Sequence, residues 1–150
     1  MVAKKPFVLY KASTISDKKT AIDTVSKFGF ELKHLPEQFR NDRDVVLAAV
    51  NRQGSALQYA SDQYRDDKEV VIAALRSGGE ALEFASDRLR GDKDVVLIAV
   101  SGWGTALEYA ADRLRNDKEV VLAALRDDKS AIEHVSDVLR GDMDVVQATK

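Results

Sequence analysis

The chain has 150 residues, of which 45% are hydrophobic and 32% are charged, and its formal net charge is −2. It contains no cysteine, which excludes disulfide bonds, cysteine-ligated zinc and thiol catalysis. The slightly acidic balance argues against a nucleic-acid partner, and no apolar run approaches the ~20 residues that cross a bilayer. We therefore expect a cytoplasmic protein with neither a nucleic-acid nor a membrane partner.

Residues 1–16 precede the regular part of the sequence. They hold the apolar run Phe7–Tyr10 near lysines at positions 4, 5 and 11, and this run is shorter than the hydrophobic region of a secretory signal. Because the first unit of a repeat array exposes apolar surface that needs a cover, we expect residues 1–16 to form an N-terminal cap. Deleting them should then lower the melting temperature.

From residue 17 the sequence repeats every 25 residues. Aspartate recurs at positions 17, 42, 67, 92, 117 and 142, and the copies 42–66 and 67–91 share 12 identities in 25 positions. The first copy is the most divergent, and the sixth is partial. We predict one repeat domain over residues 17–150, with repeats at 17–41, 42–66, 67–91, 92–116, 117–141 and, in part, 142–150.

The first half of each repeat has the pattern of an α-helix. Apolar residues fall on one helical face, as in Val45, Val46, Ala49 and Val50. Asp42 stands just before this stretch, where a carboxylate accepts hydrogen bonds from the N–H groups of the first turn. We therefore predict an aspartate-capped helix of about ten residues in every repeat.

Glycine follows this helix at positions 54, 79 and 104. A glycine at such a position commonly adopts the left-handed conformation that closes a helix, and we expect that conformation here. Lys129 occupies the same place in the fifth repeat. A left-handed residue other than glycine is strained by roughly 1 kcal/mol, so Lys129→Gly is expected to stabilise the protein slightly.

The second half of each repeat is predicted to be a shorter, bent helical segment. Pairs with the spacing of capping boxes open it in three repeats: Ser55 and Gln58, Thr105 and Glu108, Ser130 and Glu133. Pro36 shares a column with Ser61, and proline is tolerated in the first turn of a helix but not in its interior. We predict a short helix over about 55–60, a break near Ser61 and a helical turn over about 62–65.

A single repeat cannot bury its own apolar face, so neighbouring repeats must stack. The expected core consists of these residues and their 25-residue equivalents: Val45, Val46, Ala49, Val50, Leu57, Ala60 and Tyr64. The predicted fold is all-α, an α-helical solenoid of about five 25-residue repeats plus a partial sixth.

The repeat resembles the one known as domain of unknown function 4116, through the sequence patterns D-K-E-V-V-L-A-A-V and G-x-A-L-x-Y-A-S-x-x-L-R. The resemblance covers residues 17–148 and is most specific over 42–140. It implies an α-helical array and supplies no catalytic residues, since that family is uncharacterised. The alternation of an α-helix with a tighter helical segment is also similar to leucine-rich-variant repeats.

The candidate catalytic and metal-binding residues fit structural roles better. His34 and His134 share a column four repeats apart, on the order of 40 Å when helical layers stack, and we expect both to be half-buried rings. Asp–Arg pairs such as Asp62 and Arg65 would bind a phosphate or an acidic tail if free. We favour a staple between segments, because carboxylates neutralise the arginines. We predict no catalytic, cofactor-binding or metal site, and no enzyme activity.

Trp103 is the single tryptophan of the chain. Its column also holds Gln53, Gly78 and Asp128, so we expect it to project from a turn between helices. Tryptophan is enriched among the residues that dominate protein interfaces, which makes Trp103 a candidate anchor for a partner. The alternative is an end-packed or isolated surface aromatic.

A second candidate surface runs along the solenoid. Tyr59, Phe84, Tyr109 and His134 form one column, and Glu83, Glu108 and Glu133 stand beside it. An aromatic stripe next to an acidic stripe suits a basic peptide, extended or helical. This hypothesis requires the rings to keep solvent exposure and to face one side. In the alternative, the rings are core between repeats and the carboxylates only cap helices.

The leading functional hypothesis is a non-enzymatic protein-protein interaction or scaffold module, whose partner is an unidentified protein or peptide. It depends on an analogy with other repeat proteins, which present extended binding surfaces. A structural spacer within a larger repeat polypeptide is the alternative. An enzyme of unrecognised type comes third.

Overall fold

The computed structural model describes residues 12–150, and within this range the chain is helical without any strand. The long α-helices are α1 (Lys18–Lys27), α3 (Arg43–Arg52), α5 (Lys68–Ser77), α7 (Lys93–Gly102), α9 (Lys118–Asp127) and α11 (Met143–Ala148). The 3₁₀ helices are η1 (Ala12–Thr14), η2 (Gly29–His34), η3 (Gly54–Tyr59), η4 (Gly79–Phe84), η5 (Gly104–Tyr109) and η6 (Lys129–His134). The short α-helices are α2 (Glu37–Arg40), α4 (Asp62–Arg65), α6 (Asp87–Arg90), α8 (Asp112–Arg115) and α10 (Asp137–Arg140).

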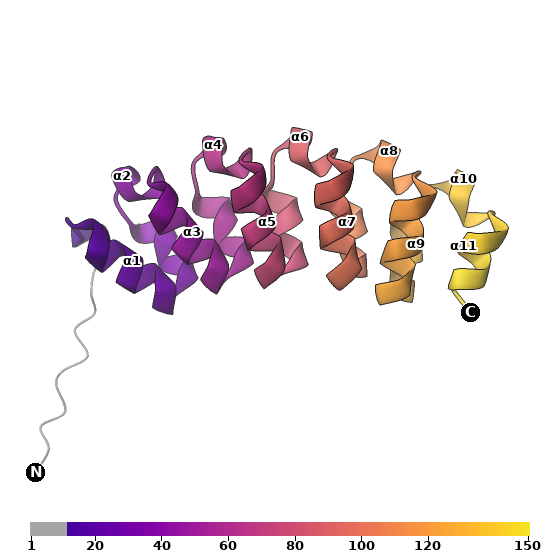
Figure 1. Cartoon of the computed structure of the whole chain (residues 1–150), viewed down its shortest axis with the longest axis horizontal. Helices are drawn as coiled ribbons and strands as arrows, with labels where there is room; N and C mark the ends of the chain where they lie inside the picture. Colours follow the sequence, from indigo (N-terminus) through magenta and orange to yellow (C-terminus); the bar gives the residue numbers. More distant parts are fainter. Residues whose placement is uncertain (1–11) are drawn as a thin grey trace, which may run out of the picture.

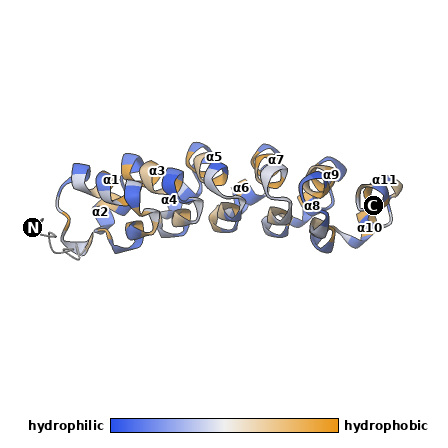
Figure 2. Ribbon diagram, turned by 90° about the horizontal axis from the view of Figure 1, so that it is seen from below, coloured by the Kyte–Doolittle hydropathy of each residue, from blue (hydrophilic) through white to orange (hydrophobic). Residues whose placement is uncertain are grey.

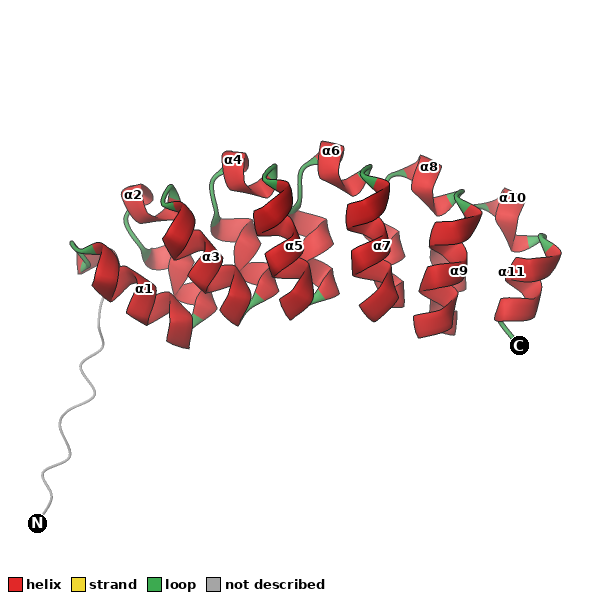
Figure 3. Cartoon of the chain, viewed as in Figure 1, coloured by secondary structure: helices red, strands yellow, loops and turns green. Residues whose placement is uncertain are grey.

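These elements stack into the predicted all-α solenoid, with α1 and α11 at its opposite ends (Figure 1, Figure 3). The long α-helices form one layer and the 3₁₀ helices form the other, and the two rows are visible when the molecule is seen from below (Figure 2). The short helices run along one edge (Figure 1). Every repeat therefore presents the same three kinds of surface.

Each long helix begins after an aspartate that caps it, as the sequence predicts. In the fourth repeat, Asp92 Oδ1 accepts hydrogen bonds from the N–H groups of Asp94 and Val95, at 3.0 and 3.2 Å. These bonds satisfy donors that the helix itself cannot pair. The helix of the second repeat ends where Gln53 turns extended, with φ −156° and ψ 107°.

The second half of each repeat contains the predicted break, but not the predicted capping boxes. In the second repeat, η3 starts at Gly54, and its N-cap residue Gln53 makes no side-chain capping bond. Instead of pairing with a capping serine, Gln58 Nε2 donates to the backbone carbonyl of Ser55 at 2.9 Å. A 3₁₀ segment that begins one residue earlier leaves the serine inside the helix.

The expected left-handed glycines are wrong, since no residue in the range 12–150 has a positive φ. The glycines serve close packing instead. A Cβ on Gly54 would lie 2.3 Å from the carbonyl oxygen of Ala74, and one on Gly104 would lie 2.4 Å from that of Ala124. Glycine therefore lets η3 and η5 approach the long helix of the next repeat. Lys129 is exposed and not left-handed, so the reason for expecting Lys129→Gly to stabilise the protein is removed.

The core lies between the two layers and follows the predicted columns. In the second repeat Val45, Val46, Ala49, Val50, Leu57 and Ala60 are all buried. Tyr64 is half-buried, and its hydroxyl donates to the Asn41 carbonyl of the preceding repeat at 2.9 Å. The apolar columns of successive repeats form one continuous cluster.

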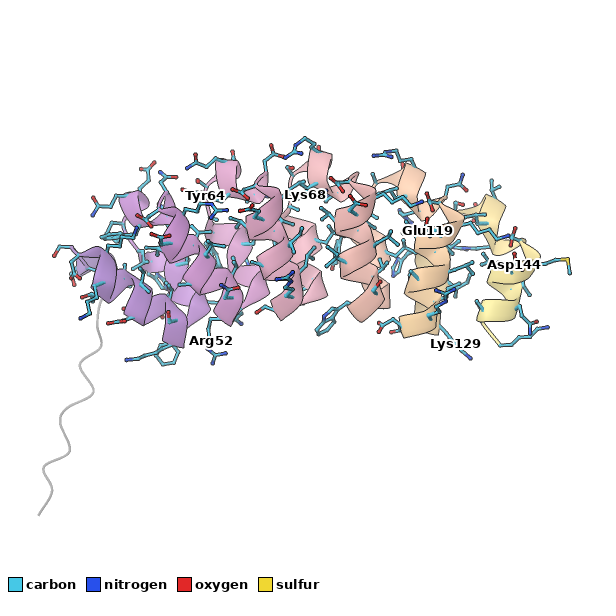
Figure 4. The ribbon with its side chains drawn as sticks, in the orientation of Figure 1. Arg52, Tyr64, Lys68, Glu119, Lys129 and Asp144 are labelled. Atoms are coloured by element: carbon cyan, nitrogen blue, oxygen red, sulfur yellow. The ribbon has the colours of Figure 1, made fainter. Side chains whose placement is uncertain are left out.

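A ladder of ion pairs joins the repeats along the ends of the long helices. Lys68 Nζ lies 2.9 Å from Asp92 Oδ2 and 3.5 Å from Asp94 Oδ2, both in the next repeat. The same arrangement recurs at Lys18, Arg43, Lys93 and Lys118. Figure 4 shows Lys68, Glu119 and Asp144 near the same end of α5, α9 and α11. From Asp42 onward, each capping aspartate thus binds its own helix through Oδ1 and the cation of the previous repeat through Oδ2.

On the short-helix edge, Arg65 and Arg115 staple their repeats to the next one, as favoured from the sequence. Arg65 Nε donates to the Phe84 carbonyl of the next repeat at 2.7 Å, and its guanidinium lies 3.6 Å from Asp62. The backbone follows the same route, because the Ser86 N–H donates to the Arg65 carbonyl at 2.9 Å. These bonds occupy the groups that an anionic ligand would need.

The predicted N-terminal cap lies mostly outside the described residues. Of the segment 1–16, the structure places Ala12 and Ile15, and both are buried. Residues 1–11 fall outside the described range, so the cap remains a prediction for them.

Candidate partner-binding surface

The outward side of the 3₁₀ layer carries the acidic column. In a 3₁₀ helix, residues three positions apart lie on the same side, which pairs Glu80 with Glu83 on η4 and Thr105 with Glu108 on η5. All four side chains are exposed, and so is Glu133 on η6. Because η4, η5 and η6 contact one another in order, their carboxylates form one acidic strip, which we define as Glu80, Glu83, Glu108 and Glu133.

The aromatic column lies beside this strip. Tyr59, Phe84, Tyr109 and His134 are half-buried, packed against the core yet open to solvent on one side. The four rings therefore keep part of the solvent exposure that the stripe hypothesis requires, and none of them is fully buried. The rings belong to the core and to the surface at once.

The first two repeats show how a ring of this column is covered. Tyr59 meets Phe30 of the previous 3₁₀ helix edge to face, with the ring centroids 6.1 Å apart. Lys33 Nζ lies over the same ring, 6.0 Å from its centroid. Residues of one 3₁₀ helix thus pack on the aromatic ring of the next. His34, in contrast, is exposed, so the half-buried ring expected there is wrong.

Carboxylates surround Tyr109. A hydrogen bond to Glu108 raises the pKa of the Tyr109 hydroxyl to about 12, with further contributions from burial and from the charges of Glu83 and Glu80. His134 Nε2 lies 3.5 Å from Glu108 Oε2. Ionising Tyr109 would add a negative charge to an acidic region, so its hydroxyl keeps its proton.

The acidic strip differs from the carboxylates of the ladder, because its members have no lysine or arginine partner in the described range. The aspartates and glutamates of the ladder each face a lysine or an arginine. Within residues 12–150, no lysine or arginine forms a salt bridge with Glu80, Glu83, Glu108 or Glu133. Arg140 contacts Glu133, but it donates to the backbone carbonyl of that residue, at 2.7 Å, and not to the carboxylate. The strip therefore presents exposed carboxylates that no lysine or arginine of the described chain pairs with directly.

Trp103 borders the same surface. It follows α7, its N–H donates to the Ala99 carbonyl at 3.0 Å, and its side chain is 51% exposed. It lines a recess of about 200 Å³ together with Glu80, Thr105, Ala106, Glu108 and Tyr109. The structure thus brings the two sequence-predicted features, the tryptophan and the stripe, into one place.

Sequence reasoning missed two parts of this surface. Phe28 shares the column of Trp103 and is 63% exposed, but it lies in the divergent first repeat. Glu80 was not predicted, since its column otherwise holds Phe30, Ser55, Thr105 and Ser130. The signal that would have found Glu80 is the three-residue period of a 3₁₀ helix, which places it beside Glu83.

Other kinds of site find no support in the described chain. Residues 12–150 contain no group of three or more His, Asp or Glu side chains placed to hold a metal ion. None of the described helices is long and apolar enough to span a membrane.

Comparison with known proteins gives one result. The family model described as a domain of unknown function (DUF4116) matches four overlapping stretches, at residues 17–65, 44–90, 67–115 and 92–140. The curated proteins and the solved structures provide no match. The four stretches follow the 25-residue period and together span most of the chain. The chain therefore belongs to the DUF4116 family of repeat proteins.

Proposed function

We propose that this protein is a non-enzymatic interaction module that binds a basic peptide segment along its 3₁₀ face. One observation carries the proposal: the acidic strip is exposed and has no lysine or arginine partner in the described chain, whereas the ladder carboxylates are paired. Exposed like charges in a row oppose folding slightly, and a cationic partner relieves that repulsion. The half-buried rings alongside add contact area.

The spacing of the carboxylates in the acidic strip determines how far apart the lysines of the peptide should be. Helical layers stack about 9–10 Å apart, and an extended peptide in the polyproline II conformation advances about 3.1 Å per residue and returns every third side chain to the same side. Lysines at every third position of an extended peptide therefore meet Glu83, Glu108 and Glu133 in successive repeats. The first repeat has Lys33 in this column and the second has Gln58, so the peptide binds the last three full repeats.

The test uses a fluorescent synthetic peptide with lysine at every third residue. A peptide of the same composition with the lysines clustered serves as the reference. We expect the spaced peptide to bind at least fivefold more tightly than the clustered peptide. A few exposed charge pairs of roughly 0.2–1 kcal/mol each would produce a difference of this size. Equal binding of the two peptides would contradict the proposal.

Variants of the protein sharpen this test. Replacing Glu83, Glu108 and Glu133 together by glutamine should weaken binding of the spaced peptide by about fivefold or more. The matched control replaces Asp44, Asp94 and Asp144 by asparagine, because these exposed carboxylates lie in the first turns of the long helices and not on the 3₁₀ layer. It changes the net charge equally and should leave binding nearly unchanged. Equal losses in the two triple variants would indicate a response to net charge alone.

A structural spacer is the second candidate, and the shape of the solenoid favours it. The repeats stack in single file, with α1 and α11 at opposite ends (Figure 1), so the domain would separate whatever is joined to those ends. A spacer has no need of the acidic strip. If all peptides bind weakly and neither triple variant changes the affinity for them, the result would favour the spacer.

A further inference from the structure

The recess beside Trp103 has an unusual combination of walls. Two aromatic side chains, Trp103 and Tyr109, stand with the carboxylates of Glu80 and Glu108 around a space of about 200 Å³. No lysine, arginine or histidine lines it. Aromatic faces and carboxylates share one preference, since both attract a cation.

Trp103 is held in place by its surroundings. A Cβ on Gly79 would lie 2.3 Å from Cβ of Trp103 and 2.4 Å from its Cγ, so the tryptophan side chain starts directly against the backbone of η4. Gln53, Gly78 and Asp128 in the same column show that the repeat does not require an aromatic residue here. A tryptophan that is 51% exposed and fixed at its base suits contact with a partner.

The chain itself shows a cation on this aromatic column. Lys33 of η2 places its ammonium over the Tyr59 ring, 6.0 Å from the centroid. Two repeats later, the residues in register are Glu83 and Tyr109. The ring of Tyr109 therefore has an acidic neighbour where Tyr59 has a lysine, and the cation at this position is left for a partner to supply.

We propose that this recess binds one lysine side chain of the peptide partner. Its ammonium would lie between the carboxylates of Glu80 and Glu108, and its methylene stem would pack on Trp103. A lysine fits this role because its stem covers apolar surface while its compact charge reaches the polar groups. The inference rests on the proposed function, and it assigns one residue of the peptide to a defined subsite.

The experiment uses Trp103 as its own reporter, because it is the only tryptophan in the chain. The probe is Nα-acetyl-lysine methylamide, and the neutral reference is the corresponding norleucine compound. We expect the lysine compound to shift the indole N–H resonance of Trp103 in a saturable way. We expect the norleucine compound to leave it nearly unchanged. Equal shifts with both compounds would overturn the assignment, since the recess would then be a general apolar site.

Charge variants test the two carboxylates. Combining Glu80→Gln with Glu108→Gln should weaken binding of the lysine compound by about fivefold, the effect of two exposed charge pairs. Glu133→Gln is the matched control, because it removes a carboxylate of the same strip that does not line the recess. Unchanged binding in the double variant would overturn the proposal.

The peptide then separates this subsite from the wider function. Trp103→Gln introduces the residue found at position 53, and it should weaken the spaced lysine peptide by about threefold to tenfold. If the peptide binds this variant as it binds the wild type, yet loses affinity for the triple glutamine variant, the subsite is wrong and the proposed function stands. If the peptide binds neither the wild type nor any variant, the proposed function fails as well.

Discussion

Gly54 and the carbonyl group of Ala74 pack so closely that a Cβ on residue 54 would lie 2.3 Å from the carbonyl oxygen. This contact joins η3 of one repeat to α5 of the next. It explains a glycine column that turn geometry does not require, since the backbone has no positive φ within the described range. Small side chains at these points set how closely the two layers stack.

Replacing Gly54 by alanine should therefore destabilise the protein. The added methyl group meets a backbone carbonyl that cannot move away without disturbing α5, and overpacking of this kind costs about 1–3 kcal/mol. Gly102→Ala is the control, because a Cβ there has no heavy atom within 4 Å and alanine favours a helix. Urea unfolding should show a loss for the first variant and a small gain for the second. A gain for Gly54→Ala would contradict the packing explanation.

Lys129→Gly should reduce stability, the reverse of the effect predicted from the sequence. Lys129 lies in the glycine column at the exposed start of η6 (Figure 4). Its φ is not positive, so glycine relieves no strain and only loosens the unfolded chain, at a cost of about 0.4–1 kcal/mol. Thermal unfolding measures the difference. A higher melting temperature for the variant would mean that the lysine is strained after all.

Removing one cation from the ladder should lower the melting temperature in a salt-dependent way. Lys68→Gln leaves Asp92 and Asp94 without their partner. The loss should be clear at low ionic strength and small near 1 M salt, where the Debye length is about 3 Å. Lys150→Gln makes the same charge change at an exposed residue in no salt bridge and should have little effect. A salt-independent loss at Lys68 would indicate packing of its stem rather than charge.

The protein should lose stability in acid through its capping aspartates. The ammonium of Lys68 lowers the pKa of Asp92, and Lys93 and Lys118 do the same for Asp117 and Asp142. A carboxyl group with a lowered pKa in the folded state stabilises that state above its ordinary value of about 3.9. This contribution is lost as the pH falls through the lowered pKa. Melting temperatures should therefore drop below about pH 4, and Asp92→Asn should flatten that drop.

The hydroxyl of Tyr109 should lose its proton only at a pH well above the usual range for tyrosine. Its pKa of about 12 is raised first by the hydrogen bond to Glu108, so Glu108→Gln should bring the pKa down towards the ordinary value of about 10. Because the folded state holds this proton more tightly, stability should fall as the pH rises between these values. The ¹³Cζ shift of Tyr109 follows the titration. Glu133→Gln is the control. An unchanged Tyr109 pKa in Glu108→Gln would show that the hydrogen bond to Glu108 does not cause the shift.

Local chemistry in the sequence predicted most of the fold. The aspartate at Asp42 and its equivalents marked the helix starts, and Pro36 located the break, because both act within one turn. The role of Gly54 could not be predicted, since it depends on a carbonyl in the next repeat. The ladder was missed for the same reason, although the recurring basic residue between two acids at Asp92–Asp94 contained the signal. The recess at Trp103 needed the pairing of Glu80 with Tyr109 across repeats.

The ladder also gives the stack a direction. From the first repeat to the fifth, each repeat extends its cation to the capping aspartate of the next, as Lys68 does to Asp92. In the sixth repeat this column holds Met143, which is 87% exposed and carries no charge. All ion pairs of the ladder therefore point the same way along the chain. A repeat in the middle of the array offers a cation to the neighbour that follows it and carboxylates to the neighbour that precedes it, so its two stacking faces differ in charge.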